Sequence, residues 1–85
     1  MKFTDIIDEN EQERQRQEEL WSQPHRWGVG DCSSKTIAPE VKLMVLTEEV
    51  GEAAKAIYDG NLDHLRDELV QVAAVCVAWL ESFDG

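Results

Sequence analysis

A run of twelve residues near the C-terminus, LVQVAAVCVAWL (69–80), contains a single polar residue, Gln71. The run is longer than a typical β-strand and has no glycine or proline to interrupt it, so it predicts a helix. A helix that is apolar on nearly every side has to be buried on nearly every side. The remainder of an 85-residue chain cannot surround it. We therefore expect copies of the chain to associate as a homo-dimer or a homo-tetramer.

The charge balance restricts the partners of this chain. It has 8 Lys and Arg residues against 18 Asp and Glu residues, which gives a formal charge of −10. Nucleic acids and anionic membrane surfaces both attract basic patches, so we expect neither as a partner. If the substrate is itself an anion, a divalent cation held by the acids has to neutralise it.

The N-terminal sequence and the cysteines indicate a cytoplasmic protein. The opening residues, MKFTDIIDENEQERQRQEE, become acidic and polar at once, unlike a secretory signal. No apolar run approaches the roughly 20 residues that a membrane span needs. Cys32 and Cys76 are too few for a disulfide framework. We expect Cys32 to be a reduced thiol in a polar loop and Cys76 to be an inert core thiol.

Three helices are predicted within a single all-α domain, 1–85. They span about residues 5–21, 39–59 and 62–83. Thr4 is suited to the N-cap position of the first helix. That helix is rich in Glu, Gln and Arg but has few apolar residues. We expect it to form a solvated arm or lid, or an arm exchanged between subunits.

The second and third helices are predicted to form a tight antiparallel hairpin. Pro39 fits the first turn of the second helix, and Gly60 is suited to end it. Asn61 can then cap the third helix, so the connection is very short. We expect this hairpin and the N-terminal helix to form a four-helix-bundle-like core that is completed by oligomerisation.

Acidic residues lie within the otherwise apolar hairpin. Glu49 and Glu52 are three residues apart and share a helix face, as do Glu68 and Gln71 on the next helix. Glu52 and Glu68 each lie about two turns from Gly60, which is roughly 12 Å at 1.5 Å per residue. The two pairs are therefore expected to face each other at one level of the hairpin.

Such a convergence of carboxylates indicates a cation site. Like charges that are brought together repel, and burial increases the cost unless a cation compensates it. Mg²⁺ takes oxygen ligands and often binds through carboxylates together with substrate phosphates, and Mn²⁺ is the alternative cation. The other interpretation is an ordinary solvated helix face, on which Glu48, Glu49 and Glu52 point towards water.

Two segments, LTEEVGEAAKAI (46–57) and LRDELVQVAAV (65–75), resemble the MazG-like all-α nucleoside triphosphate pyrophosphohydrolases. The resemblance covers about residues 42–80. The signature of that superfamily is an ExxE pair on one helix and an ExxD pair on the next. Its members are helical bundles that assemble as dimers or tetramers, which agrees with the apolar run at 69–80.

The resemblance implies a role for each acidic position. Glu49 and Glu52 fall on the first acidic pair, and Glu68 falls on the first member of the second pair. Glu52 and Glu68 are then metal ligands, with Glu49 available to the metal as well, and Glu48 or Glu49 orients the attacking water. Gln71 departs from the pattern, because the family has Asp there and an amide brings no charge.

The implied reaction is Mg²⁺-dependent hydrolysis of a nucleoside triphosphate to a monophosphate and pyrophosphate, in the cleaning of nucleotide pools. The change at Gln71 keeps a second interpretation open. The chain would then be a non-catalytic helical oligomer, or a nucleotide-binding regulator, that kept the scaffold and lost the site.

Three other residues, Trp27, Arg26 and Lys55, have two interpretations each, and His64 has one. Trp27 and Arg26 precede the acidic helix and could stack on a base and meet a phosphate. They could equally belong to a loop anchored by tryptophan packing. Lys55, three residues after Glu52, could reach a phosphate or form a surface ion pair. His64, near the start of the third helix, is expected to be a surface residue.

Overall fold

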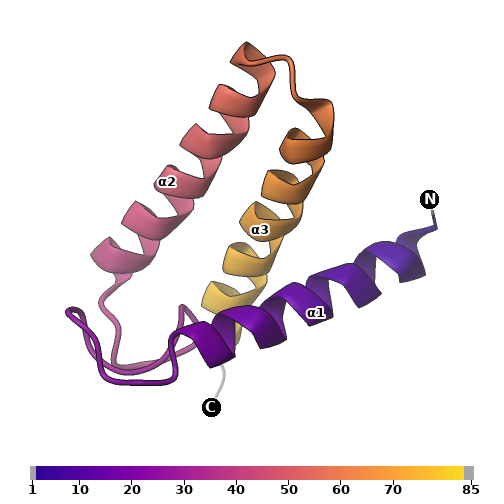
Figure 1. The fold of residues 1–85 in the computed structure, drawn as a ribbon. Helices are drawn as coiled ribbons and strands as arrows, with labels where there is room; N and C mark the ends of the chain where they lie inside the picture. Colours follow the sequence, from indigo (N-terminus) through magenta and orange to yellow (C-terminus); the bar gives the residue numbers. More distant parts are fainter. Residues whose placement is uncertain (1, 84–85) are drawn as a thin grey trace.

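The hairpin is the main structural unit of the fold (Figure 1). The computed structural model describes residues 2–83, which contain three α-helices and no β-strand. Helix α2 (Pro39–Tyr58) and helix α3 (Leu62–Glu81) pack side by side and antiparallel, and α1 (Phe3–Leu20) packs on α3. The all-α class predicted from the sequence is confirmed.

Local sequence signals fix the ends of the hairpin helices. Pro39 occupies the first turn of α2, as expected. Gly60 has a φ of +71°, in the left-handed region that favours glycine, and the turn then reverses the chain. The Asn61 side chain accepts a hydrogen bond of 3.1 Å from the backbone N–H of His64 and so caps α3. Each helix ends one or two residues earlier than predicted.

Helix α1 begins earlier than the sequence predicted. Its N-cap position is Lys2, so Thr4 lies within the first turn and the expectation that Thr4 caps the helix is wrong. The cause is that the backbone N–H groups of Asp5 and Ile6 already bond to the carbonyl of Lys2. The helix packs on α3 of its own chain, although most of its residues remain exposed, as expected of a solvated helix.

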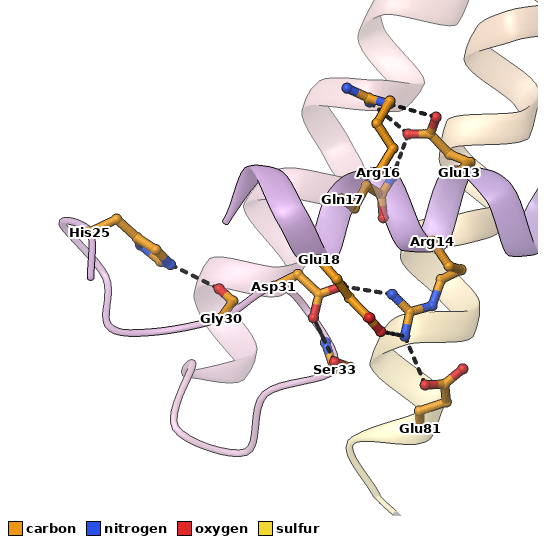
Figure 2. Close-up of polar contacts among 10 residues, drawn as sticks. All are labelled: Glu13, Arg14, Arg16, Gln17, Glu18, His25, Gly30, Asp31, Ser33 and Glu81. Carbon is orange, nitrogen blue, oxygen red and sulfur yellow. Dashed lines mark hydrogen bonds and ion pairs between the residues drawn. The ribbon is translucent and has the colours of Figure 1, made fainter. Parts of the chain in front are cut away.

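Several polar side chains connect helix α1 to the rest of the chain. Arg14 is buried and donates to Asp31 at 2.7 Å and to Glu81 at 2.7 Å, with a weaker bond to Glu18 at 3.1 Å (Figure 2). Near the other end of α1, Glu9 accepts two hydrogen bonds from Arg66 of α3. Arg14 therefore joins α1, the loop 21–38 and the end of α3 at one point.

The core is small and lies where this loop meets the hairpin. Cys32, Val75 and Ala78 form a buried cluster, against which Val45 and Leu46 pack. Cys32 is thus a core residue and not the polar-loop thiol that we predicted, because the loop folds under the open end of the hairpin (Figure 1). Burial is also the largest effect on the Cys32 thiol, and it raises its pKa, which disfavours a reactive thiolate.

Several large apolar side chains remain exposed on the hairpin. On α3, Leu69 is 55% and Leu80 is 67% exposed, so this helix is not covered on all sides within one chain. On α2, exposed residues recur every seven positions at Leu43, Val50 and Ile57. Seven residues correspond to nearly two helical turns, so these three side chains form a stripe along one face of α2.

Candidate metal centre

The hairpin brings Glu52 of α2 and Glu68 of α3 together at one level. Ligand atoms of Glu52, His64 and Glu68 all lie within 4.8 Å of one another. The two glutamates approach across the hairpin, and His64 joins them because it lies one turn before Glu68 on the same helix face. The predicted matching heights of Glu52 and Glu68 therefore correspond to a real proximity of their side chains.

Glu68 is the buried member of this group. Its side chain is only 7% exposed, and its Oε1 lies 3.5 Å from His64 Nε2. Its Oε2 is fully buried and has no hydrogen-bond partner within residues 2–83. A buried carboxylate oxygen without a donor is costly, so this atom is available to a cation.

Glu49 adds a third carboxyl group to the site. Burial, followed by a hydrogen bond to Glu68 and by the charges of Glu68, Glu48 and Glu52, raises the pKa of Glu49 to about 7. Its Oε2 is also buried and lacks a hydrogen-bond partner in the described part of the chain. The charges of Glu68, Glu48 and Glu52 thus act on a half-buried carboxyl, and a cation bound among them would offset that repulsion.

These donors fit a divalent cation. Carboxylate oxygens are the ligands that hard cations prefer, and two of the oxygens here, Oε2 of Glu49 and Oε2 of Glu68, are buried. Glu48 is exposed at the edge of this acidic group and adds to its negative charge. The residue types present are therefore compatible with a divalent cation between α2 and α3.

The pKa of Glu49 should make the stability of the metal-free protein depend on pH. An unfolded glutamate titrates near 4.5, whereas Glu49 in the folded protein titrates near 7. The folded state therefore retains a proton that the unfolded state loses, so this stabilisation is complete below 4.5 and is lost as pH rises through 7. Because Glu49 is only half-buried, we expect the loss to be about 1–2 kcal/mol.

Urea unfolding in EDTA at about pH 5 and about pH 8 measures this loss. The variant Glu49→Gln is the control, since it cannot titrate and should flatten the dependence over this range. Equal pH dependence in the variant and the original protein would contradict the role of Glu49.

A groove lies next to the acidic group. Its volume is about 330 Å³, and among its lining residues are Glu48, Glu49, Gln71 and Arg16. Arg16 donates to Glu13 at 2.6 Å (Figure 2), and the charge of Glu49 is among the effects that raise the Arg16 pKa. The groove thus has carboxylates at one side and a guanidinium group near them.

Two tryptophans contribute to the apolar part of the groove. Trp21 and Trp27 line it and also line an adjoining recess of about 50 Å³, which reaches Ile37 and Val75. Both indoles are partly exposed, at 38% and 39%, so a planar ligand could reach them. The aromatic recess and the carboxylates therefore belong to one continuous surface.

The loop that carries Trp27 is held by local contacts. His25 and Gly28 exchange backbone hydrogen bonds of 2.8 and 3.1 Å. The ring of His25 bonds to the carbonyl of Gly30 at 2.8 Å (Figure 2) and lies edge-on to Trp21, with ring centroids 5.1 Å apart. Gly28 has a φ of +136°, and a β-carbon there would lie 2.9 Å from the Ile37 side chain, so glycine is required.

Three other predicted site residues, Gln71, Arg26 and Lys55, lie in different surroundings. Gln71 is half-buried and lines the groove together with Glu49. The Arg26 guanidinium lies over the Trp27 ring, 5.4 Å from its centroid. Lys55 instead bonds to Asp59 at 2.8 Å on an exposed part of α2, which is the surface ion pair that we considered.

His64 is exposed, as predicted, but sequence reasoning did not place His64 or Arg16 in this region. The spacing of His64 and Glu68, one helical turn apart, could have indicated that the imidazole shares the face of the acidic site. Arg16 had no comparable signal, because its place depends on how α1 packs on α3.

Among the described residues, no helix is long and apolar enough to cross a membrane. Comparison of the chain with protein-family models, with curated proteins and with solved structures gave no significant match.

Proposed function

We propose that this protein is a Mg²⁺-dependent nucleoside triphosphate pyrophosphohydrolase of the MazG-like type. It would be cytoplasmic and would act on nucleotide pools. The observation that carries the proposal is the meeting of Glu49, Glu52 and Glu68, with two buried carboxylate oxygens that lack a hydrogen-bond partner within residues 2–83. Carboxylates that lie this close together repel one another, and a bound cation would offset that cost.

Each acidic residue has its own role in the proposed reaction. Glu52 and Glu68 hold the cation, which when bound neutralises charge on the phosphate oxygens. Glu49 orients the attacking water and accepts its proton, since it lies beside Glu52 and Glu68 and lines the groove. Glu48, exposed beside it, can assist in orienting that water. The bond that breaks joins the α- and β-phosphates, and the products are a nucleoside monophosphate and pyrophosphate.

The groove supplies the remaining contacts of the proposed substrate. A base would stack on Trp21 or Trp27 at the apolar recess, because every base offers a π-face to an indole. The phosphates would then extend towards Glu48, Glu49 and the guanidinium of Arg16. Arg26 would serve mainly to hold Trp27, over which it lies. Lys55 is engaged by Asp59 and contributes less to this arrangement.

Self-association of the chain as a dimer or tetramer is part of the proposal. The radius of gyration of one chain is 13.3 Å, against about 12 Å for a compact domain of 85 residues. Leu69 and Leu80 of α3 and the stripe of α2 remain exposed on the hairpin. Contact with a second copy would bury these side chains and complete a four-helix core.

Gln71 supports a second candidate, a nucleotide-binding regulator or helical oligomer without turnover. The amide lies in the groove next to Glu49, where the family pattern has a carboxylate. Because an amide contributes a weaker oxygen ligand and no charge, cation binding would persist through Glu52 and Glu68 while turnover falls. The variant Gln71→Asp separates the candidates, since it should restore turnover in a protein that only binds.

The decisive experiment is the release of pyrophosphate from a panel of ribo-, deoxyribo- and modified nucleoside triphosphates. We expect release that needs Mg²⁺, disappears in EDTA and falls at least about 100-fold in Glu52→Gln, since that variant loses a charged ligand. The variant Asp67→Asn removes one negative charge next to the site and should retain activity. Full activity in Glu52→Gln would contradict the assignment, and light scattering on the same samples reports the oligomeric state.

A further inference from the structure

We infer that the cation centre is a mixed nitrogen–oxygen site in which His64 is a direct ligand, and that it prefers first-row transition metal ions to Mg²⁺. The inference rests on the cation site of the proposed function but not on hydrolysis itself. The three ligands would be an imidazole nitrogen of His64 and one carboxylate oxygen each from Glu52 and Glu68.

The geometry places these three groups in position for a single ion. Their ligand atoms lie within 4.8 Å of one another in the absence of any ion. Bonds of about 2.0–2.2 Å from a metal to nitrogen and oxygen ligands place neighbouring ligand atoms roughly 3–4 Å apart. Side-chain rotations are enough to close that difference, because Glu52 and His64 are both exposed at the surface.

A second observation, the state of the Glu68 carboxylate, supports a ligand at this site. The Glu68 side chain is more than nine-tenths buried, and its Oε2 has no hydrogen-bond partner within residues 2–83. The other oxygen, Oε1, lies 3.5 Å from His64 Nε2, beyond the usual length of a hydrogen bond between nitrogen and oxygen. An ion between His64 Nε2 and Oε1 of Glu68 would bind both of these atoms, and bidentate binding by the carboxylate would also satisfy Oε2.

The backbone holds His64 where a ligand needs to be. Its N–H donates to the Asn61 side chain at the start of α3, which fixes the first turn of that helix. The spacing of four residues then places the imidazole over Glu68, on the side of α3 that faces Glu52. Glu52 completes the group from across the hairpin.

The donor set decides which cations bind well. Mg²⁺ takes oxygen ligands and keeps several waters, so an imidazole adds little to its binding. Imidazole suits zinc, iron, copper and nickel, and affinity for a nitrogen- and oxygen-containing site rises from Mn²⁺ through Co²⁺ to Ni²⁺ and Cu²⁺. A centre with one histidine and two carboxylates should therefore bind Mn²⁺, Co²⁺ and Zn²⁺ more tightly than Mg²⁺.

The other explanation of the same contact is a helix-surface ion pair between His64 and Glu68. Such a pair depends on a protonated imidazole and predicts no selectivity among divalent cations. Selectivity that His64 creates is therefore the property that distinguishes the two explanations.

The test is a titration of the tag-free full chain with MgCl₂, MnCl₂, CoCl₂ and ZnCl₂, each followed by calorimetry. The visible absorption of bound Co²⁺ reports the ligand set independently. We expect Mn²⁺ and Co²⁺ to bind at least about 10-fold more tightly than Mg²⁺. In His64→Ala their affinities should fall at least about 10-fold, and that of Mg²⁺ less than about 3-fold.

Two controls make the result specific. His25→Gln changes the only other histidine, away from the acidic group, and should keep the cation preference. Glu52→Gln should weaken the binding of all four cations. His64 is half-exposed, so His64→Ala is expected to fold, and circular dichroism checks its helix content.

Unchanged cation affinities and an unchanged Co²⁺ spectrum in His64→Ala would overturn the inference. If that variant also retains Mg²⁺-dependent pyrophosphate release, the proposed function stands without it. Absence of binding by any cation, together with absence of release, would overturn both.

Discussion

In metal-free protein at about pH 8, Glu68→Gln should raise the free energy of unfolding by about 1–3 kcal/mol while it removes cation binding and turnover. The buried Glu68 carboxylate has one oxygen without a partner among the described residues and lies against Glu49. An amide of nearly the same shape removes the repulsion and can donate a hydrogen bond to Glu49. For a domain of this size, each kcal/mol corresponds to roughly 4–8 °C in Tm.

Thermal unfolding in EDTA and in excess MgCl₂ measures both parts of this prediction. The original protein should gain stability from the cation, and Glu68→Gln should gain little, because the cation can stabilise only a folded state that binds it. Asp67→Asn is the matched control, since it removes the same charge from the neighbouring exposed position and should change stability by less than about 0.5 kcal/mol. A Glu68→Gln protein that is less stable in EDTA than the original would show that the carboxylate serves packing.

Such an opposition between stability and activity is expected at a functional site. A protein that keeps repelling carboxylates in its hairpin gives up stability in the absence of its ligand. The same pair of glutamates explains why stability of the metal-free protein should fall between about pH 5 and about pH 8.

The second large effect concerns Arg14, which is not one of the proposed metal ligands. Arg14→Leu should destabilise the fold by about 3–5 kcal/mol, because it leaves the buried carboxylate of Asp31 without its cation. Asp31 is 8% exposed and accepts from Arg14 at 2.7 Å, so water cannot readily replace the guanidinium. Total stabilities of small domains are about 5–15 kcal/mol, so this variant should lose a large part of its own.

Chemical denaturation of three variants tests this. Arg16→Leu is the matched control, because Arg16 lies two residues away on α1. Its guanidinium pairs with Glu13 near the surface, and losing this ion pair should lower the free energy of unfolding by about 0–1 kcal/mol. The double variant Arg14→Leu, Asp31→Leu should recover much of the loss, since no unpaired charge then remains buried. Equal losses in Arg14→Leu and Arg16→Leu would contradict the role of Arg14 in joining the loop to α1 and α3.

The sequence predicted the parts of the fold that short-range rules control. Pro39, Gly60 and Asn61 act on the backbone within one turn of their own positions, so the hairpin could be predicted from them. Because the hairpin is tight and helical rise is constant, the shared level of Glu52 and Glu68 followed as well. Thr4 is an exception, since a residue suited to a cap does not fix a helix start when the backbone continues the helix.

Only the tertiary structure decided the contacts that depend on α1 and the loop 21–38. Arg14 meets Asp31 and Glu81 across 17 and 67 residues of sequence, and no local spacing encodes such a contact. The groove between Trp21, Trp27 and Glu49 arises in the same way, from the path of the loop under the hairpin. The sequence by itself therefore determined the helices and the level of the acids, because helix geometry is periodic and local. The partners of those acids and the shape of the surface beside them depend on long-range packing.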